Sequence, residues 1–198
     1  MIINIRGTHG SGKSTIVRQL IERYSASKVG DNPRKPIGYR MNTPFGKLQV
    51  IGSYETACGG CDGIQPYALI WPMVVEAAKL AHVVFEGALV SSSYGNIGRA
   101  SEVYGDQFVF AFLDTPIEVC LERIVARRLA KGNLKPLDPK NTKHKYDSII
   151  GSIKKIRDEF HRPVIILDHR KPVPQLLSLL NRYNDERRTI LDGQPNGR

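Results

Sequence analysis

A glycine-rich octapeptide near the start of the chain constrains the fold more than any other feature. Residues 7–14 read Gly-Thr-His-Gly-Ser-Gly-Lys-Ser and satisfy the pattern G-x-x-x-x-G-K-[ST] at every fixed position. An apolar run at residues 2–6 comes directly before it, and apolar residues with a helical period follow it, at Ile16, Val17, Leu20, Ile21 and Tyr24. The sequence therefore predicts a strand, a glycine loop and a helix in immediate succession, which is the setting of a phosphate-binding loop.

The residue types of the octapeptide suit the binding of a nucleoside triphosphate. Glycines let backbone N–H groups turn inward around phosphate oxygens, and the helix that follows directs the positive end of its dipole at the same oxygens. We expect Lys13 to reach the β- and γ-phosphates of ATP and the Ser14 hydroxyl to bind Mg²⁺. The predicted ATP-binding residues are Gly7, Thr8, His9, Gly10, Ser11, Gly12, Lys13, Ser14 and Thr15. The alternative is a glycine-rich turn that matches the pattern by chance. Such a turn would not require an apolar strand directly before it and an amphipathic helix directly after it.

Strands and helices alternate along the rest of the chain. The apolar patterns predict strands at 37–41, 47–51, 83–85, 107–113 and 164–167, and helices at 67–81, 117–130, 145–161 and 174–183. This alternation predicts the three-layer α/β/α fold of P-loop NTPases, with a mostly parallel central sheet. We expect one domain over residues 1–183 and a disordered tail at 184–198. Asp114 or Thr115 should cap the helix at 117–130, with Pro116 at its first position.

Positive charge is concentrated in two segments. The chain carries 29 Lys and Arg against 19 Asp and Glu, a net charge of +10. Residues 123–145 contain eight of the basic residues and one acid, Asp138, whereas residues 28–47 contain five basic residues and one acid. A solvated surface is one interpretation. A cluster this one-sided is more typical of a protein that faces phosphate groups.

Two further segments supply candidate carboxylates. Residues 83–87 form an apolar strand that ends at Glu86-Gly87, and a carboxylate after such a strand can lie near Mg²⁺ or near the attacking nucleophile. Glu86 is therefore predicted to bind the metal, through water, or to accept the proton of an acceptor hydroxyl. The alternative is that Glu86 is only a polar residue at the end of a strand, with no role in the site. The glycine-rich segment 53–65 is the predicted acceptor loop, in which Asp62 or Glu55 would orient the hydroxyl.

Cysteine content and hydropathy narrow the class of protein. Cys58 and Cys61 form a C-x-x-C pair, but a zinc site would need two more ligands, and a redox role would need a thioredoxin-like context. The apolar run at residues 1–5 is too short for a signal peptide, and no window approaches the ~20 apolar residues of a membrane span. Three cysteines are not a secretory disulfide framework. We therefore expect a cytoplasmic protein with no membrane partner.

The segment at residues 114–118 resembles the lid region of small nucleotide kinases such as thymidylate kinase. It reads Asp-Thr-Pro-Ile-Glu and leads into a helix that carries Arg123, Arg127 and Arg128. The resemblance implies a basic lid, at about 123–145, whose arginines close over the transferring phosphoryl group. Arg123 and Arg127 would act in catalysis, and Arg128 would contact the nucleotide. A solvent-facing basic helix is the alternative.

The last predicted strand and the loop after it match the same kinases. In that family the loop after the last strand lies against the adenine of ATP. Carried over, residues 169–172 would form the purine-binding loop, and Arg170 would stack on the base.

Four segments together resemble a family of small P-loop kinases from tailed bacteriophages. They are residues 6–15, 54–62, 85–87 and 114–116, and the resemblance extends over about residues 1–183. The Cys-Gly-Gly-Cys-Asp sequence in the second segment is the most discriminating part. The family includes kinases that phosphorylate the hydroxymethyl group of 5-hydroxymethyluracil within phage DNA. The resemblance implies this acceptor for the chain, in the cytoplasm of the host cell.

The basic charge fits a DNA acceptor, because a DNA kinase must hold a phosphate backbone in addition to its nucleotide. A base within duplex DNA would have to be flipped out, or the substrate would have to be single-stranded. Two alternatives stay open. One is a deoxynucleoside monophosphate kinase that acts on free deoxynucleotides, and the other is a non-catalytic ATP-binding switch or ATPase. The sequence leaves the oligomeric state open.

Overall fold

The computed structural model describes residues 1–56, 59–92 and 94–192, and it contains a seven-stranded sheet. The strands are β1 (Ile2–Arg6), β2 (Ser27–Val29), β3 (Gly38–Thr43), β4 (Gly46–Ile51), β5 (His82–Glu86), β6 (Phe108–Leu113) and β7 (Val164–Leu167). Their order across the sheet is β2-β3-β4-β5-β1-β6-β7, and four of the six pairings are parallel. β1 therefore lies inside the sheet, between two strands that come much later in the chain.

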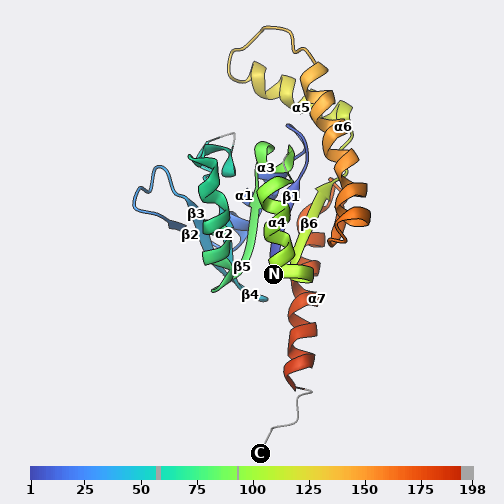
Figure 1. The fold of residues 1–198 in the computed structure, drawn as a ribbon. Helices are drawn as coiled ribbons and strands as arrows, with labels where there is room; N and C mark the ends of the chain where they lie inside the picture. Colours follow the sequence, from blue (N-terminus) through green and yellow to red (C-terminus); the bar gives the residue numbers. More distant parts are fainter. Residues whose placement is uncertain (57–58, 93, 193–198) are drawn as a thin grey trace, which may run out of the picture.

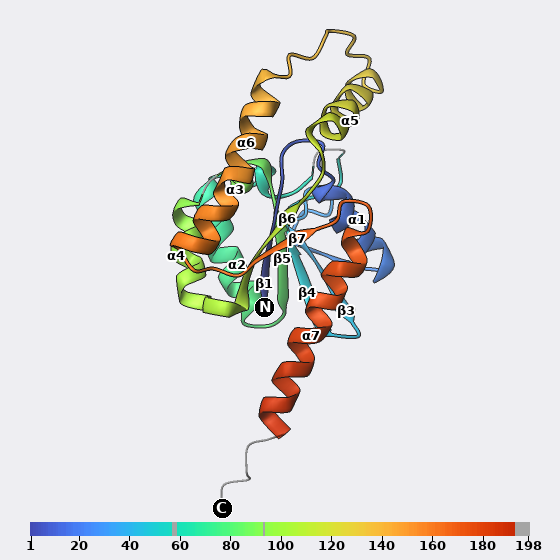
Figure 2. The same cartoon turned by 90° about the vertical axis from the view of Figure 1, so that its right-hand side faces the viewer.

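Helices cover both faces of this sheet (Figures 1 and 2). They are α1 (Lys13–Arg23), α2 (Ile70–Ala78), α3 (Ala88–Ser92), α4 (Gly95–Tyr104), α5 (Ile117–Leu129), α6 (Lys140–Lys154) and α7 (Pro172–Asp192). One apolar core joins α1 and α7 to one face, and a second core joins α2, α3, α4 and α6 to the other. The predicted three-layer α/β/α fold with a mostly parallel sheet is confirmed. In the part of the chain that the structure describes, no helix has the length and apolar character to cross a membrane.

Successive residues of β1 supply the two cores in turn. Ile3 and Ile5 pack in the core with α1 and α7, whereas Ile2 packs in the opposite core, and all five residues of the strand are buried. A parallel strand buried on both faces needs a nearly continuous apolar run. Arg6 closes the run, and its guanidinium is buried 5.6 Å from the ring centre of Phe110 and donates a hydrogen bond to Ser91 O.

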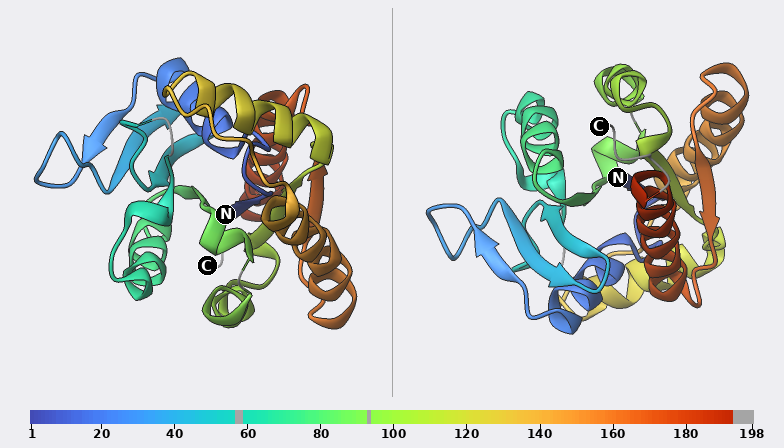
Figure 3. Two further views of the ribbon diagram at one scale, coloured as in Figure 1. Left: turned by 90° about the horizontal axis from the view of Figure 1, so that it is seen from above. Right: turned by 90° about the horizontal axis from the view of Figure 1, so that it is seen from below.

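The carboxyl ends of β1, β5 and β6 meet at one edge of the sheet. Ile5 of β1 lies opposite Glu86 of β5, and Arg6 lies opposite Phe112 of β6. The loops that follow these three strands are therefore brought together. α5, the connection after it and the first turns of α6 rise above this edge as a hairpin, which we call the lid (Figure 1, and from above in Figure 3).

Most predicted elements are present, and the differences lie where the apolar period is weak. β3 and β4 pair antiparallel as a hairpin, but the sequence analysis did not identify β2, α3 or α4. α6 begins at Lys140, five residues before the predicted start. α7 continues to Asp192, so the predicted helix end at residue 183 is wrong. No Gly or Pro interrupts 184–192, which explains the continuation, and residues 193–198 lie outside the described residues.

The predicted cap of α5 is also wrong. Pro116 itself occupies the N-cap position, and no side chain caps this helix. Thr115 Oγ1 instead donates to Ser11 O at 2.7 Å, and Asp114 Oδ1 accepts a hydrogen bond from His169 N at 2.7 Å. Both side chains are engaged by neighbouring loops at the sheet edge, so they join those loops rather than cap a helix.

Candidate active site

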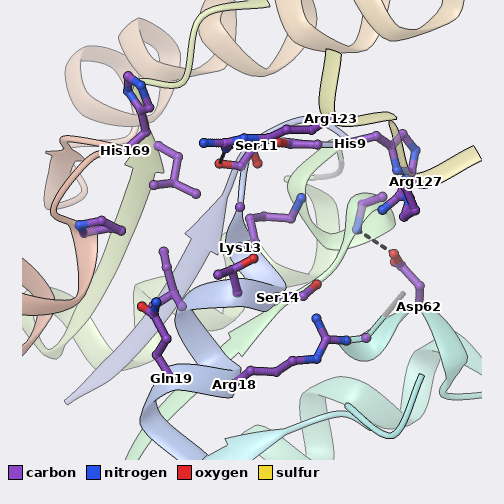
Figure 4. A pocket seen from close by; sticks show the side chains of 18 of the residues that line it. His9, Ser11, Lys13, Ser14, Arg18, Gln19, Asp62, Arg123, Arg127 and His169 are labelled. Atoms are coloured by element: carbon purple, nitrogen blue, oxygen red, sulfur yellow. Dashed lines mark hydrogen bonds between the residues drawn. The ribbon is translucent and has the colours of Figure 1, made fainter. Parts of the chain in front are cut away.

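A cavity of about 550 Å³ opens at this edge of the sheet, beneath the lid (Figure 4). Its lining residues come from the phosphate loop and α1, from the loops after β4 and β7, from the start of α3, from the end of β6 and from α5. They are His9, Gly10, Ser11, Gly12, Lys13, Ser14, Thr15, Ile16, Arg18, Gln19, Gly59, Asp62, Ala88, Leu113, Arg123, Arg127, His169, Arg170 and Pro172. The cavity thus brings together residues as far apart in the sequence as His9 and Pro172.

The phosphate loop has a backbone that only glycine adopts readily at two positions. Gly10 and Gly12 have φ angles of 79° and 106°, in the left-handed region. A Cβ on Gly10 would also overlap Cys120 O, at the second turn of α5. The buried hydroxyls of Thr8 and Ser11 have no hydrogen-bond partner among the described residues. Buried hydroxyls without a partner carry a desolvation cost, which an anion held in the loop would relieve.

Lys13 is buried at the first turn of α1. Its Nζ donates to Gly7 O at 2.8 Å and to Thr8 O at 3.1 Å, so the side chain lies back against its own loop. Burial lowers the pKa of Lys13, and the nearby carboxylates Glu86 and Asp62 oppose this shift. The cation is therefore held at the cavity floor with carbonyl partners that phosphate oxygens are able to replace.

Ser14 and Glu86 form a hydrogen-bonded pair beside Lys13. Ser14 Oγ donates to Glu86 Oε1 at 2.8 Å, and Glu86 is only 1% exposed. Burial raises the pKa of Glu86, whereas the charge of Lys13 and the hydrogen bond from Ser14 oppose the rise. The buried ring of Tyr54 interacts electrostatically with the same carboxylate. A hydroxyl and a carboxylate are oxygen ligands of the kind that Mg²⁺ prefers, so this pair fits the predicted metal site.

Asp62 lines the cavity, but both of its carboxylate oxygens are occupied. They accept hydrogen bonds from Ala88 N at 2.8 Å and Leu89 N at 3.0 Å, at the start of α3. Figure 4 shows one hydrogen bond of Asp62 as a dashed line. A Cβ on Gly87 would lie 2.8 Å from Asp62 Oδ1, so glycine is required for this approach. The predicted role of Asp62 as a free carboxylate near the acceptor is not supported. Its contacts make it an anchor between the acceptor loop and the start of α3.

Glu55, the other carboxylate predicted in the acceptor loop, points to a different neighbour. It accepts hydrogen bonds from Lys28 Nζ and from Tyr39 Oη, both at 2.6 Å, and it does not line the cavity. The C-x-x-C pair lies in the same segment. Cys58 is outside the described residues, and Cys61 is buried with its Sγ 3.6 Å from Ile51 O.

The lid contributes two arginines to the cavity. Arg123 Nη1 donates to Gly10 O and to Ser11 O, both at 3.3 Å, and Arg127 lies one turn further along α5. Burial lowers the pKa of His9, and the charges of Lys13, Lys145 and Arg127 add to the effect. Since Lys145 belongs to α6, both helices of the lid direct positive charge at the phosphate loop.

Arg128 does not join Arg123 and Arg127 in the cavity, contrary to the prediction. Its Nη2 donates to Lys135 O at 3.0 Å and lies 3.5 Å from Asn133 Oδ1. Consecutive residues of an α-helix are rotated by about 100°, so Arg128 faces the connection after α5 when Arg127 faces the cavity.

The predicted purine-binding loop forms the opposite end of the cavity. His169 Nδ1 lies 2.9 Å from Asp114 Oδ1, which ties the loop after β7 to the loop after β6. Arg170 lines the cavity with a side chain that is 76% exposed, and it pairs with Asp168 at 3.0 Å. An exposed planar cation at this place is free to stack on a base.

Comparison with known proteins identifies the family. The chain is 38% identical over 174 residues to the "5-hmdU DNA kinase" of Pseudomonas phage PaMx11, a match that covers 84% of this chain and 90% of the relative. The chain belongs to this kinase family. Proteins of the same name from Delftia phage PhiW-14 and Pseudomonas phage M6 are 31% and 36% identical, with 79% and 65% of this chain covered and 64% and 73% of theirs. No protein-family model matches.

Two solved structures are similar to this kinase in outline. A deoxyadenosine kinase from M. mycoides has a TM-score of 0.49 at 14% identity, with 93% of this chain and 100% of that chain covered. A gluconokinase from Sinorhizobium meliloti has a TM-score of 0.48 at 15% identity, with 97% of each chain covered. The family membership therefore comes from the phage relatives. The chain is a P-loop kinase, as the octapeptide predicts.

The sequence analysis did not identify Arg18 and Gln19 of the kinase as cavity residues. Both lie on α1 just after the phosphate loop. Arg18 is four residues after Ser14, and residues four apart share a helix face. That spacing is the signal that would have placed Arg18 beside Ser14.

Glu86→Gln tests the burial of this carboxylate independently of activity. Since the pKa of Glu86 is raised above 4.5, the folded kinase binds this proton more tightly than the unfolded chain, and stability is lost as the pH rises from 4.5 through the raised pKa. We expect the free energy of unfolding of wild type, from urea denaturation, to fall relative to that of Glu86→Gln over this range. A difference between the two proteins that stays constant with pH would contradict the assignment.

Proposed function

We propose that this kinase transfers the γ-phosphoryl group of ATP to the hydroxymethyl group of 5-hydroxymethyluracil in DNA. The observation that carries the proposal is the cavity that joins the phosphate loop, Ser14 and the acceptor loop beneath a basic lid, with Glu86 buried behind Ser14 and hydrogen-bonded to it. The printed name of the phage relatives supports the acceptor. The net charge of +10 supports a polyanionic partner.

The donor half of the site fits ATP and Mg²⁺. In the proposed complex Lys13 leaves the carbonyls of Gly7 and Thr8 and donates to the phosphates, and the partnerless hydroxyls of Thr8 and Ser11 gain acceptors. Ser14 and Glu86 would hold the Mg²⁺, which neutralises charge on the phosphates when it is bound. Arg170 would stack on the adenine at the far end of the cavity.

In the acceptor half we assign the hydroxyl proton to Glu86 rather than to Asp62. Asp62 already accepts hydrogen bonds from two backbone N–H groups, one at each oxygen, whereas Glu86 interacts with the side chains of Ser14 and Tyr54. Glu86 would therefore align the hydroxyl for in-line attack and accept its proton, and Asp62 would position the acceptor loop.

The lid would stabilise the charge of the transferring group. Phosphoryl transfer depends mainly on positioning and on cations around the moving group, because there is little covalent chemistry for the protein to perform. Arg123 is already bonded to the phosphate-loop carbonyls, so it would shape the loop. Arg127 is the lid arginine left to reach the phosphoryl oxygens.

The outer surface of the lid suits a nucleic-acid backbone. Lys131, Lys135, Lys140 and Lys143 are all exposed, and they follow the lid from the end of α5 into α6. The basic residues of 28–47 would extend this surface, although Lys28 is paired with Glu55. A deoxynucleoside monophosphate kinase would need no such surface, and this is why we favour the DNA acceptor over the free nucleotide.

The acceptor is tested by comparing rates of labelled phosphate transfer from ATP. We expect transfer to a single-stranded oligonucleotide that contains one 5-hydroxymethyluracil, and none to the same oligonucleotide with thymine or to thymidine monophosphate. Lys13→Ala should abolish the transfer and remain folded. Faster transfer to the free monophosphate would favour the nucleotide kinase, and ATP hydrolysis without any acceptor would favour the ATPase.

Arg127→Ala and Arg128→Ala form a matched pair of lid variants. If Arg127 contacts the transferring group, its loss should lower kcat at least ~10²-fold, whereas Arg128→Ala should leave kcat near that of wild type. Single-turnover kinetics at saturating ATP would measure both. Equal effects of the two variants would show that the lid acts by net charge and not through Arg127.

A further inference from the structure

Arg18 lies in the half of the cavity that is remote from the purine-binding loop. It is one helical turn after Ser14 on α1, and its side chain extends past Ser14 toward Asp62 and away from His169 (Figure 4). The acceptor loop contributes Gly59 and Asp62 to the cavity lining, and Arg18 contacts the same loop at Thr56. Arg18 is therefore a cation on the acceptor side of the metal-binding serine.

Three other cations of the cavity wall have partners that account for their positions, and the fourth, Arg127, belongs to the lid. Lys13 and Arg123 bond to carbonyls of the phosphate loop, and Arg170 pairs with Asp168. Arg18 has no carboxylate partner within the described residues. Its Nη2 donates a hydrogen bond to the carbonyl oxygen of Thr56. A guanidinium has five N–H groups in a planar fork, so one such bond holds Arg18 in place and leaves most of the fork for a ligand.

The chemistry of the proposed acceptor supplies an anion at this place. The hydroxymethyl group is on C5 of the pyrimidine, and in the common anti conformation that edge of the base faces the nucleotide's own 5′ phosphate. When the hydroxymethyl group points at the phosphate loop, this phosphodiester therefore enters the same end of the cavity. Arginine binds phosphate oxygens in a two-pronged geometry that lysine does not reproduce.

We propose that Arg18 forms a subsite for the phosphodiester on the 5′ side of the acceptor nucleotide. The inference rests on the proposed DNA acceptor and adds to it the group by which the nucleotide is held. The subsite would position the hydroxymethyl group in line with the γ-phosphate. It would also disfavour free nucleosides, which lack the phosphate. A purely structural role for Arg18, as a tie between α1 and the acceptor loop through Thr56, is the interpretation to be excluded.

Oligonucleotides with one neutral methylphosphonate test the subsite. The methylphosphonate is placed in turn at each phosphate around a single 5-hydroxymethyluracil, and kcat/KM is measured for wild type, Arg18→Ala and Arg18→Lys. In wild type, neutralising the phosphate immediately 5′ should lower kcat/KM by about tenfold or more, the scale of a lost charge-assisted hydrogen bond. Arg18→Ala should have the lower kcat/KM on normal DNA and show no further loss at that position, with KM for ATP unchanged.

Two further variants complete the design. Arg23→Ala removes an arginine from the same helix outside the cavity and should keep the sensitivity of wild type. Arg18→Lys keeps the positive charge and most of the aliphatic side chain. Its kcat/KM should be less sensitive than that of wild type to the methylphosphonate on the 5′ side. If Arg18→Ala does not fold, Arg18→Lys serves as the test variant. Equal sensitivity of wild type and the Arg18 variants at every position would overturn the subsite alone. No transfer by wild type to DNA with normal phosphates would overturn the proposed function as well.

Discussion

The parallel pairing of β1 with β5 and β6 brings the phosphate loop, Glu86 and the loop after β6 together. Because Ile5 lies opposite Glu86, the carboxylate comes to rest under the first turn of α1, where it accepts the hydrogen bond of Ser14. The strand on the other side delivers Thr115, which donates to Ser11 O. A shift of the β1–β5 register by one residue would turn Glu86 to the opposite face of the sheet and remove it from the site.

Two opposite charges are buried where these strands end. Lys13 and Glu86 are both almost fully buried. Burial lowers the pKa of Lys13 and raises the pKa of Glu86, and both shifts favour the neutral form of the side chain. Burial of charge is costly unless partners compensate, and here the partners are loop carbonyls, a serine hydroxyl and the opposite charge. A site assembled in this way is prepared for a ligand that brings phosphate and a divalent cation together.

The parts of this structure that depend on local sequence could be predicted, and the parts that depend on distant contacts could not. The phosphate loop was predictable because glycine spacing and the flanking strand and helix are adjacent in sequence. Arg127 and Arg128 are adjacent arginines that the sequence alone does not distinguish. The rotation of about 100° between consecutive residues of α5 directs only Arg127 at the cavity. The engagement of Asp62 with the start of α3 joins residues 26 positions apart. The contact of Arg18 with Thr56 joins residues 38 positions apart, which no local pattern reveals.

The chemical position of the transferred phosphate tests the account most directly. Duplex and single-stranded DNA with 5-hydroxymethyluracil would be incubated with the kinase and ATP, digested by nuclease to nucleoside monophosphates with no phosphatase added, and analysed by mass spectrometry. The account predicts one new phosphate on the 5-hydroxymethyl group and none at the strand ends. Phosphate on a terminal hydroxyl, or only on free nucleotides, would contradict it.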